Sequence, residues 1–195
     1  MSDQLTDVVD VHDRDRLIQE ISQLRAKVAR LQERVAQLDQ LAHQDPLIKL
    51  PNRRGFMREL ERLIARVDRY GLKAAMLFVD VDGLKVINDS FGHRAGDEAL
   101  IQVANLLAKG VRHSDVVARI GGDEFGILLE CAEEQSAHET AARLIDQIAA
   151  CEVIHEGFSL PMSVAIGVGM IEATDTAELV MSRADEEMYR RKAAA

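Results

Sequence analysis

The first group of residues suited to chemistry is the Gly-Gly-Asp-Glu sequence from Gly121 to Glu124. It joins two apolar runs, 116–120 and 125–129, and is expected to form a turn. Glycines at such a place permit positive φ and a tight hairpin. Two glycines also remove side chains from the backbone, so a large ligand could lie on it beside the carboxylates of Asp123 and Glu124. An ordinary hairpin turn needs neither the second glycine nor the second acid.

A second acidic stretch, Asp80-Val81-Asp82, follows the apolar residues 74–79. Alternation along a strand puts Asp80 and Asp82 on one face at the edge of a sheet. Magnesium prefers hard oxygen ligands and takes one or two carboxylates together with substrate phosphates. If the turn lies beside this strand end, Asp80, Asp123 and Glu124 form a site for two cations. The alternative is a set of solvated loop acids, the usual fate of single aspartates.

Composition and charge restrict the partners. The chain has 195 residues, 47% hydrophobic and 29% charged, as expected of a folded globular protein. Its net charge is −9 with no long basic run, which argues against nucleic acid as the main partner. A phosphorylated substrate would therefore need a bound cation to screen the protein's own carboxylates.

Several features favour the cytoplasm and no membrane attachment. The longest apolar stretch, 74–79, is too short to cross a bilayer, and residues 1–4 do not resemble a signal peptide. Cys131 and Cys151 have no metal-ligand spacing and are expected to be reduced thiols.

The N-terminal part divides into two segments. Residues 1–13 are expected to be a polar, solvated tail, although Asp7, Asp10, His12 and Asp13 could be imagined as metal ligands. Residues 14–43 have a heptad pattern with Leu at every d and Ile or Val at every a, which favours a parallel two-stranded coiled coil. Its seam residues are Leu17, Ile21, Leu24, Val28, Leu31, Val35 and Leu38. The alternative, an amphipathic helix packed on its own domain, would have a wider apolar stripe.

Residues 44–195 form the expected second domain, which begins where Asp45-Pro46 ends the coil. Strands and helices alternate, with a hairpin in the middle, so we expect an α/β or α+β fold with helices over one sheet. Helices are predicted over about 54–70, 95–109, 135–150 and 176–192, and strands over about 74–81, 115–120, 125–130 and 162–171.

Over about residues 43–192 the chain resembles the GGDEF family of diguanylate cyclases, whose signature blocks appear in order. They are Asp45-Pro46-Leu47 through Arg54, Asp80 through Asp89, Gly92 through Asp97, Arg119 through Phe125, and Ala184-Asp185 through Tyr189 with Lys192. The resemblance implies a nucleotidyl-cyclase-like palm, with a central, mostly antiparallel sheet flanked by helices, after an N-terminal coiled-coil helix. It also implies the condensation of two GTP molecules into cyclic di-GMP, with release of pyrophosphate and dependence on magnesium or manganese.

The same resemblance implies roles for individual residues. Asp80, the Val81 carbonyl, Asp123 and Glu124 would hold metal, and Asp123 or Glu124 would help to deprotonate the attacking hydroxyl. The expected substrate-binding residues and phosphate-neutralising lysines are Gly121, Gly122, Asn88, Asp97, His93, Lys85 and Lys192.

Among these, Asn88 and Asp97 would read the guanine edge, since a carboxylate can accept from the guanine N1 and N2 hydrogens and adenine offers no such donor pair. His93 is assigned to the nucleotide pocket only because it belongs to the signature block Gly92 through Asp97. A lone histidine is more often structural.

Arg112 and Asp115 stand where the family has an R-x-x-D product-inhibition site, and Arg can bind guanine O6 and N7 in bidentate fashion. The alternative for this common pattern is a surface ion pair of little energetic value.

The resemblance further implies that each domain holds one GTP, so two domains would have to face each other. The coil would tether them as a homodimer, and a flexible joint near His43–Leu50 would let them meet.

The chain departs from the family pattern at two places. Ile48 and Lys49 stand where the family usually has Thr and Gly, and the Gly-Arg-Asn that usually follows the last-helix Lys is not found before Ala195. An arginine contact to phosphate is therefore not expected. Two other functions stay open: a GGDEF-like module that senses GTP or cyclic di-GMP without catalysis, and a purely structural coiled-coil scaffold. A purely structural scaffold would leave the residues that suit metal and guanine binding unexplained.

Overall fold

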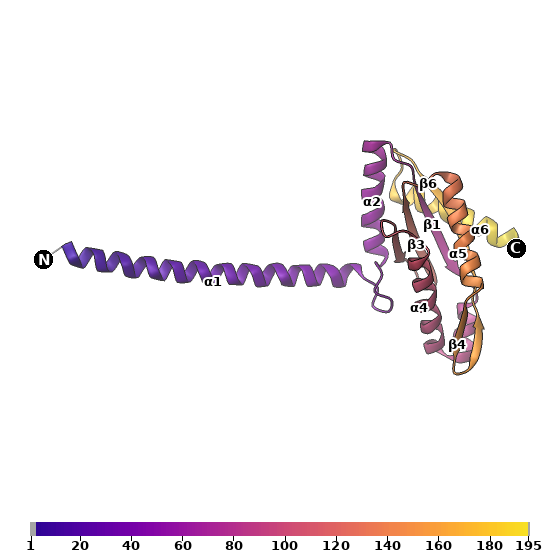
Figure 1. The fold of residues 1–195 in the computed structure, drawn as a ribbon, viewed down its shortest axis with the longest axis horizontal. Helices are drawn as coiled ribbons and strands as arrows, with labels where there is room; N and C mark the ends of the chain where they lie inside the picture. Colours follow the sequence, from indigo (N-terminus) through magenta and orange to yellow (C-terminus); the bar gives the residue numbers. More distant parts are fainter. Residues whose placement is uncertain (1–2, 195) are drawn as a thin grey trace. The chain divides into compact units, whose positions relative to one another are not determined.

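The computed structural model describes the backbone of residues 3–194 and the side chains of residues 14–39 and 41–193. The chain divides into two compact units, Met1–Ala42 and His43–Ala195, which we call the N-terminal and C-terminal units (Figure 1). Within the described part of the chain, no helix is both long enough and apolar enough to span a membrane.

The first helix, α1, runs from Asp3 to His43. Helical backbone therefore extends into the segment expected to be a polar tail, where the side chains of Asp7, Asp10, His12 and Asp13 lie outside the described residues. The heptad seam is strongly exposed, with side chains from 48% (Ile21) to 65% (Val35) accessible. A continuous exposed apolar stripe of this kind marks an interaction surface.

The C-terminal unit is built on a four-stranded antiparallel sheet of order β2-β3-β1-β6, with a separate β4–β5 hairpin. The strands are β1 (Ala74–Val81), β2 (Val116–Arg119), β3 (Glu124–Glu130), β4 (Glu152–His155), β5 (Phe158–Pro161) and β6 (Val164–Ile171). The helices are α2 (Arg53–Tyr70), α3 (Leu84–Phe91), α4 (His93–Lys109), α5 (Glu134–Ala149) and α6 (Ala177–Ala194). This architecture confirms the expected α+β fold with helices around an antiparallel sheet.

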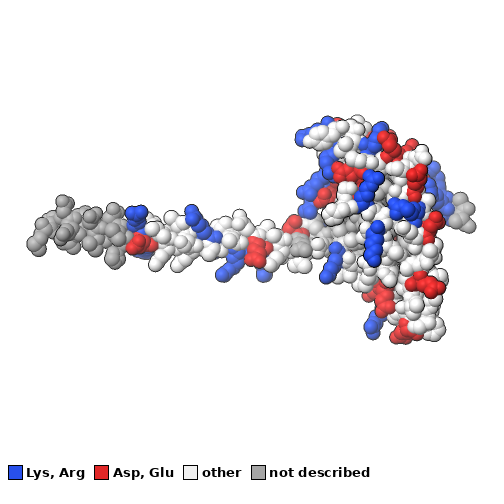
Figure 2. Space-filling view, in the orientation of Figure 1, with Lys and Arg blue, Asp and Glu red and all other residues white. Residues whose placement is uncertain are grey.

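Helices cover both faces of the sheet, which explains why β1 is an unbroken apolar run rather than an alternating one. Along β1, Leu77 and Val79 lie in a core with α3, α4 and α5. Met76 and Phe78, on the opposite face, lie in a second core with α2 and α6. On the face of the C-terminal unit shown in Figure 2, basic and acidic side chains are interspersed. That face has no continuous basic surface for a phosphate backbone.

Helix α6 lies at backbone contact distance from β6 because glycine occupies the crossing point. A Cβ at Gly167 would be 2.1 Å from the Ala184 carbonyl oxygen and 2.2 Å from the Met188 nitrogen. Any side chain at this position would push the helix away from the sheet. The close packing fixes the height at which α6 presents its polar residues above the sheet end.

The segment expected to be a flexible joint is, within the C-terminal unit, a hydrogen-bonded loop. The Asp45 N–H donates to the Leu50 carbonyl over 2.8 Å, and the Asn52 N–H donates to the His43 carbonyl over 2.9 Å. Lys49 adopts a left-handed backbone in this loop, with φ of 50°. This conformation is strained for a residue with a side chain and free of strain for glycine, which is the residue the family usually has here.

Candidate active site

The register of two neighbouring strands brings the acidic residues of the two stretches together. Asp80 of β1 lies directly opposite Glu124 of β3. The next pair is hydrogen-bonded, since the Val81 N–H donates to the Asp123 carbonyl over 2.9 Å. Asp80 and Glu124 therefore form the non-hydrogen-bonded kind of antiparallel pair, in which side chains are closest, and both lie on the same face of the sheet. This face is the one covered by α2 and α6.

The two glycines of the turn serve different purposes. A Cβ at Gly121 would lie 2.1 Å from Glu124 Oε2, so a side chain there would displace this carboxylate from its place above the turn. A Cβ at Gly122 would have no neighbour within 4 Å, so the backbone there faces open space. This is the bare, accessible surface that the sequence predicts for ligand approach.

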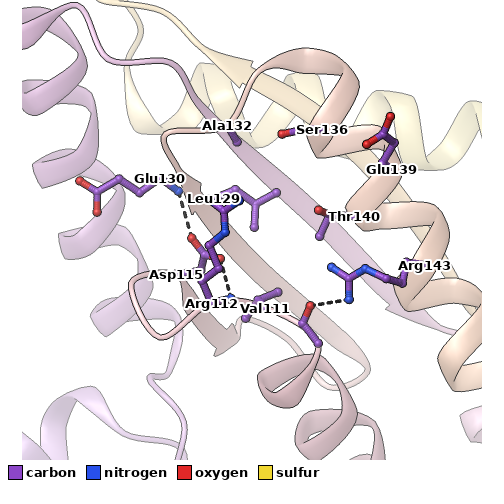
Figure 3. A pocket seen from close by; sticks show the side chains of 11 residues that line it. Val111, Arg112, Asp115, Leu129, Glu130, Ala132, Ser136, Glu139, Thr140 and Arg143 are labelled. Atoms are coloured by element: carbon purple, nitrogen blue, oxygen red, sulfur yellow. Dashed lines mark hydrogen bonds between the residues drawn. The ribbon is translucent and has the colours of Figure 1, made fainter.

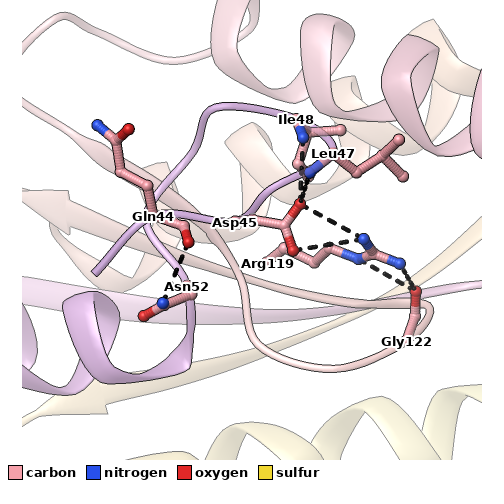
Figure 4. A network of polar contacts seen from close by, with 7 residues as sticks. All are labelled: Gln44, Asp45, Leu47, Ile48, Asn52, Arg119 and Gly122. Atoms are coloured by element: carbon pink, nitrogen blue, oxygen red, sulfur yellow. Dashed lines mark hydrogen bonds and ion pairs between the residues drawn. The ribbon is translucent and has the colours of Figure 1, made fainter. Parts of the chain in front are cut away.

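An arginine ties the turn to the loop before α2 (Figure 4). Arg119 donates to the Gly122 carbonyl from Nη2 over 2.7 Å and from Nε over 3.2 Å. Its Nη1 lies 3.4 Å from Asp45 Oδ2, and both side chains are largely shielded from solvent. Asp45 also accepts the N–H of Leu47 over 2.9 Å. The outward carbonyl of the turn is therefore held by a network that begins in the Asp-Pro-Leu block.

Helix α6 adds a positive group to the acids. The Lys192 ammonium donates to Asp80 Oδ1 and lies 3.1 Å from Asp82 Oδ1. Burial alone would lower the pKa of Lys192, but the hydrogen bonds to Asp80 and Asp82 outweigh it and raise the pKa, so the ammonium is charged. The sequence predicts Lys192 at a phosphate; the structure puts it on the neighbouring carboxylates.

The carboxylates repel one another electrostatically. Burial, followed by the charges of Asp123 and Asp80, raises the pKa of Glu124 above its ordinary value of 4.5. Asp185 of α6 adds to this effect, and Arg53 at the start of α2 opposes it. A concentration of negative charge that raises a carboxyl pKa is an arrangement that a bound cation relieves.

The donor set fits a cation that substrate helps to hold. Among the described residues, no three His, Cys, Asp or Glu side chains form a cluster able to hold a metal ion by themselves. The turn and β1 together supply the carboxylates of Asp80 and Glu124, which are paired in register, and that of the neighbouring Asp123. The Lys192 ammonium on Asp80 shows that a positive charge fits beside these carboxylates. Magnesium commonly keeps several waters and binds through one or two carboxylates plus phosphates. The residues therefore fit such an ion bound together with a nucleoside triphosphate.

The predicted guanine-reading residues lie on the two helices that meet at one corner, Asn88 on α3 and Asp97 on α4. A Cβ at Gly96 would be 2.1 Å from Asn88 Oδ1, so the Asn88 amide lies directly over the backbone beside Asp97. Lys85 and His93, at the starts of α3 and α4, are both exposed. This corner is on the α3–α4 face of the sheet, whereas Asp80 and Glu124 are on the α2–α6 face. A nucleotide that contacts both groups must therefore extend past the end of the sheet from one face to the other.

Arg112 and Asp115 line a hollow of about 550 Å³ between the loop after α4, the end of β3 and α5 (Figure 3). The Asp115 carboxylate accepts the backbone N–H of Arg112 over 2.8 Å and that of Glu130 over 3.2 Å. Its observed role is thus to fix the loop rather than to form the surface ion pair considered above. Arg143 of α5 also lines the hollow and donates to the Gly110 carbonyl over 2.8 Å.

Sequence reasoning did not assign site roles to three residues, Arg53, Asp185 and Arg143. Asp185 and Lys192 are seven residues apart on one helix, a spacing that shares a face and could have linked Asp185 to the site. Arg143 has no local signal, because only the packing of α5 against the α4–β2 loop brings it to the Gly110 carbonyl and the hollow lined by Arg112.

Comparison with known proteins decides the family. A family model described as "Diguanylate cyclase, GGDEF domain" matches residues 42–195. The chain belongs to the GGDEF family.

Individual relatives agree with this assignment. The diguanylate cyclase DgcP of Pseudomonas aeruginosa is 39% identical over 155 residues, which are 80% of this chain and 23% of DgcP. The diguanylate cyclase TpbB of the same organism is 37% identical over 171 residues, 87% of this chain and 39% of TpbB. The chain thus spans well under half the length of these curated relatives.

Two solved structures share the fold. The coiled coil and GGDEF domain of DgcB from Caulobacter crescentus, in complex with c-di-GMP, superposes with a TM-score of 0.84 at 25% identity, covering 92% of this chain and 95% of that one. A sensory box/GGDEF family protein from the same species has a TM-score of 0.73 at 35% identity, covering 78% and 99%.

The raised pKa of Glu124 predicts a pH-dependent effect of Glu124→Gln on folding. The folded GGDEF domain binds this proton more tightly than the unfolded chain, so ionisation destabilises the fold as pH rises above about 4.5. Glu124→Gln removes the charge and should stabilise the metal-free domain at neutral pH, by less than about 1 kcal/mol because the site is partly solvated. Urea unfolding at a series of pH values should show the gain shrinking to nothing below the ordinary glutamate pKa.

Glu61→Gln, on the exposed side of α2, is the matched control and should follow wild type at every pH. A Glu124→Gln domain that is less stable than wild type at neutral pH would contradict the electrostatic account.

Proposed function

We propose that this chain is a diguanylate cyclase, which condenses two GTP molecules into cyclic di-GMP and releases pyrophosphate with magnesium or manganese as its metal. The observation that carries the proposal is the register pairing of Asp80 with Glu124 beside the bare Gly121-Gly122 turn. In the reaction, the 3′-hydroxyl of one GTP attacks the α-phosphate of the other, and the bond from that phosphate to pyrophosphate breaks.

Each group at the sheet end has a part in this reaction. Asp80, the Val81 carbonyl and Asp123 would hold divalent cations, which stabilise the attacking and leaving oxygens of an in-line displacement. Glu124, whose pKa is raised, or Asp123 would take the proton of the attacking hydroxyl. Lys85 and Lys192 would neutralise charge on the triphosphate. The Gly121-Gly122 backbone would lie against the triphosphate.

Guanine selectivity would come from the α3–α4 corner. Asn88 and Asp97 supply an amide and a carboxylate that match the guanine edge, and His93 would line the same pocket. A buried donor or acceptor left without its partner is unfavourable, so a site built for guanine rejects adenine.

The N-terminal unit would make the enzyme a dimer. A parallel coil through the seam from Leu17 to Leu38 would cover the exposed stripe of α1 and hold two GGDEF domains at high local concentration. The similarity over 92% of the chain to a DgcB fragment that contains a coiled coil and a GGDEF domain supports this arrangement. Free Cys131 and Cys151, and a nucleotide substrate, favour a cytoplasmic location.

The product would regulate the enzyme at the Arg112 hollow. Arg112 of the loop after α4 and Arg143 of α5 both line it, and each guanidinium can bind a guanine O6 and N7 edge. The DgcB structure was solved with c-di-GMP, which shows that a GGDEF relative binds this product.

The main rival is a domain that senses GTP or cyclic di-GMP without turnover. Both turn acids, Asp123 and Glu124, are present, and a sensor would need neither of them.

The decisive test is incubation of the purified chain with GTP and magnesium, with cyclic di-GMP measured by chromatography. Wild type should form the product, whereas Asp123→Ala combined with Glu124→Ala should lower the rate by at least about a thousandfold with the dimer intact, since metal ligation is lost. Intact wild-type protein that forms no product but binds cyclic di-GMP tightly would establish the sensor instead.

Charged residues in the seam should separate the dimer. Leu24→Glu with Leu31→Glu puts carboxylates at two d positions, so we expect monomers by sedimentation and a rate per chain that falls at least about tenfold on dilution. Gln23→Glu with Gln37→Glu, which lie off the seam, is the control and should behave as wild type. Monomers whose rate per chain does not depend on concentration would refute tethering.

Arg112→Ala should relieve product inhibition without changing the initial rate. The concentration of cyclic di-GMP that halves the rate should rise by about tenfold or more, because a bidentate guanine contact is worth roughly 1–3 kcal/mol. Unchanged inhibition in this variant would leave the hollow without the proposed role.

A further inference from the structure

The β4–β5 hairpin has no hydrogen-bonded neighbour in the four-stranded sheet; its two four-residue strands pair with each other. Val153 and Leu160 anchor it in the core, whereas Ile154 and Phe158 are 65% and 60% exposed. An isolated two-stranded hairpin is only marginally stable, so its position depends on the contacts it makes with the rest of the fold.

Two of those contacts reach the α3–α4 corner. The rings of Phe158 and Phe91 have centroids 5.8 Å apart, within the range of favourable aromatic pairs. His155 Nδ1 lies 2.7 Å from Glu98 Oε2, and the imidazole must donate because an ionised carboxylate can only accept. Phe91, Glu98 and His155 also line an open hollow of about 350 Å³, together with His93. Strand β4 lies beside α4 in Figure 1.

Both contacts are next to residues proposed to read guanine. Phe91 is one helical turn after Asn88, whose carbonyl accepts the N–H of Gly92 over 2.9 Å. Glu98 directly follows Asp97 in α4. Helix α3 has only eight residues, too few for a stable helix in water, so its orientation must depend on tertiary contacts, which include the packing of Asn88 on Gly96 of α4.

The core holds the first part of this short helix, and the hairpin holds its last residue. Leu84 and Ile87 of α3 are buried in the core, but Phe91 is 40% exposed and its ring packs against that of Phe158. Without that ring, the last turn of α3, which carries Asn88, loses its support on the hairpin side.

We propose that the β4–β5 hairpin is a positioning element for guanine recognition, in which Phe158 and His155 hold the α3–α4 corner at the spacing that lets Asn88 and Asp97 contact one guanine edge together. This inference rests on the proposed function, because the nucleotide at the corner is taken to be GTP. The contacts of His155 and Phe158 described above are with α4 and α3, so we expect the hairpin to act on substrate binding and base selectivity and to leave the rate of the chemical step alone.

The test compares Phe158→Ala and His155→Ala with Ile154→Ala, which truncates an exposed apolar residue of the same hairpin away from the corner. We expect Phe158→Ala and His155→Ala to raise the KM for GTP roughly three- to tenfold, the scale of one aromatic or charge-assisted contact, with kcat within about twofold of wild type. The preference for GTP over ITP, which lacks the 2-amino group, should fall by a similar factor. Phe158→Tyr keeps the ring and should restore wild-type values.

Binding of 3′-deoxy-GTP, measured by calorimetry, separates the inference from the proposed function, because this nucleotide lacks the attacking hydroxyl. Weaker binding in the two hairpin variants but not in Ile154→Ala supports the inference even if the wild type forms no cyclic di-GMP. If wild type forms the product while all three variants keep the wild-type KM, preference for GTP over ITP and affinity for 3′-deoxy-GTP, the hairpin does not position the guanine-reading residues. An equal loss in all three variants would indicate general loosening and would also overturn the inference. A wild type that binds no guanine nucleotide would overturn both proposals.

Discussion

The antiparallel register of β1 against β3 is the constraint on which the rest of the site depends. Asp80 opposes Glu124, and the Val81 amide is hydrogen-bonded to Asp123. A slip of one residue would move Asp80 to the opposite face of the sheet, away from Glu124 and Lys192. Burial of β1 on both faces makes such a slip very unfavourable, because every apolar side chain would enter the wrong core. The same hydrophobic packing that stabilises the domain therefore determines which acids meet.

The remaining parts of the site are positioned relative to that register. Gly121 leaves space for the Glu124 carboxylate, and Arg119 holds the Gly122 carbonyl and reaches back to Asp45. Gly167 lets α6 approach β6, which brings Lys192 over Asp80. On the other face, Gly96 admits the Asn88 amide. Glycine at these close approaches does more than form turns, because it sets distances between elements that each carry part of a divided site.

The sequence predicts most of this arrangement because its signals are local. The apolar run before Asp80, the Gly-Gly turn and the heptads each identify an element and the residues at its end, and the α+β fold with an antiparallel sheet is confirmed. Helix α3 and the β4–β5 hairpin were missed: eight residues are too few to show a helical period, and strands of four residues around Glu156-Gly157 give little alternation. The partners of Lys192 and the presence of Arg143 in the same hollow as Arg112 depend on packing between distant elements. No local pattern encodes them.

The most direct measurement is a crystal structure of the dimer with manganese and 3′-deoxy-GTP, in which anomalous scattering locates the metal. The account predicts manganese bound by the carboxylates of Asp80 and Asp123 and by the triphosphate, with Lys192 moved from Asp80 toward phosphate. Manganese bound by the triphosphate alone, with Lys192 still on Asp80, would contradict it.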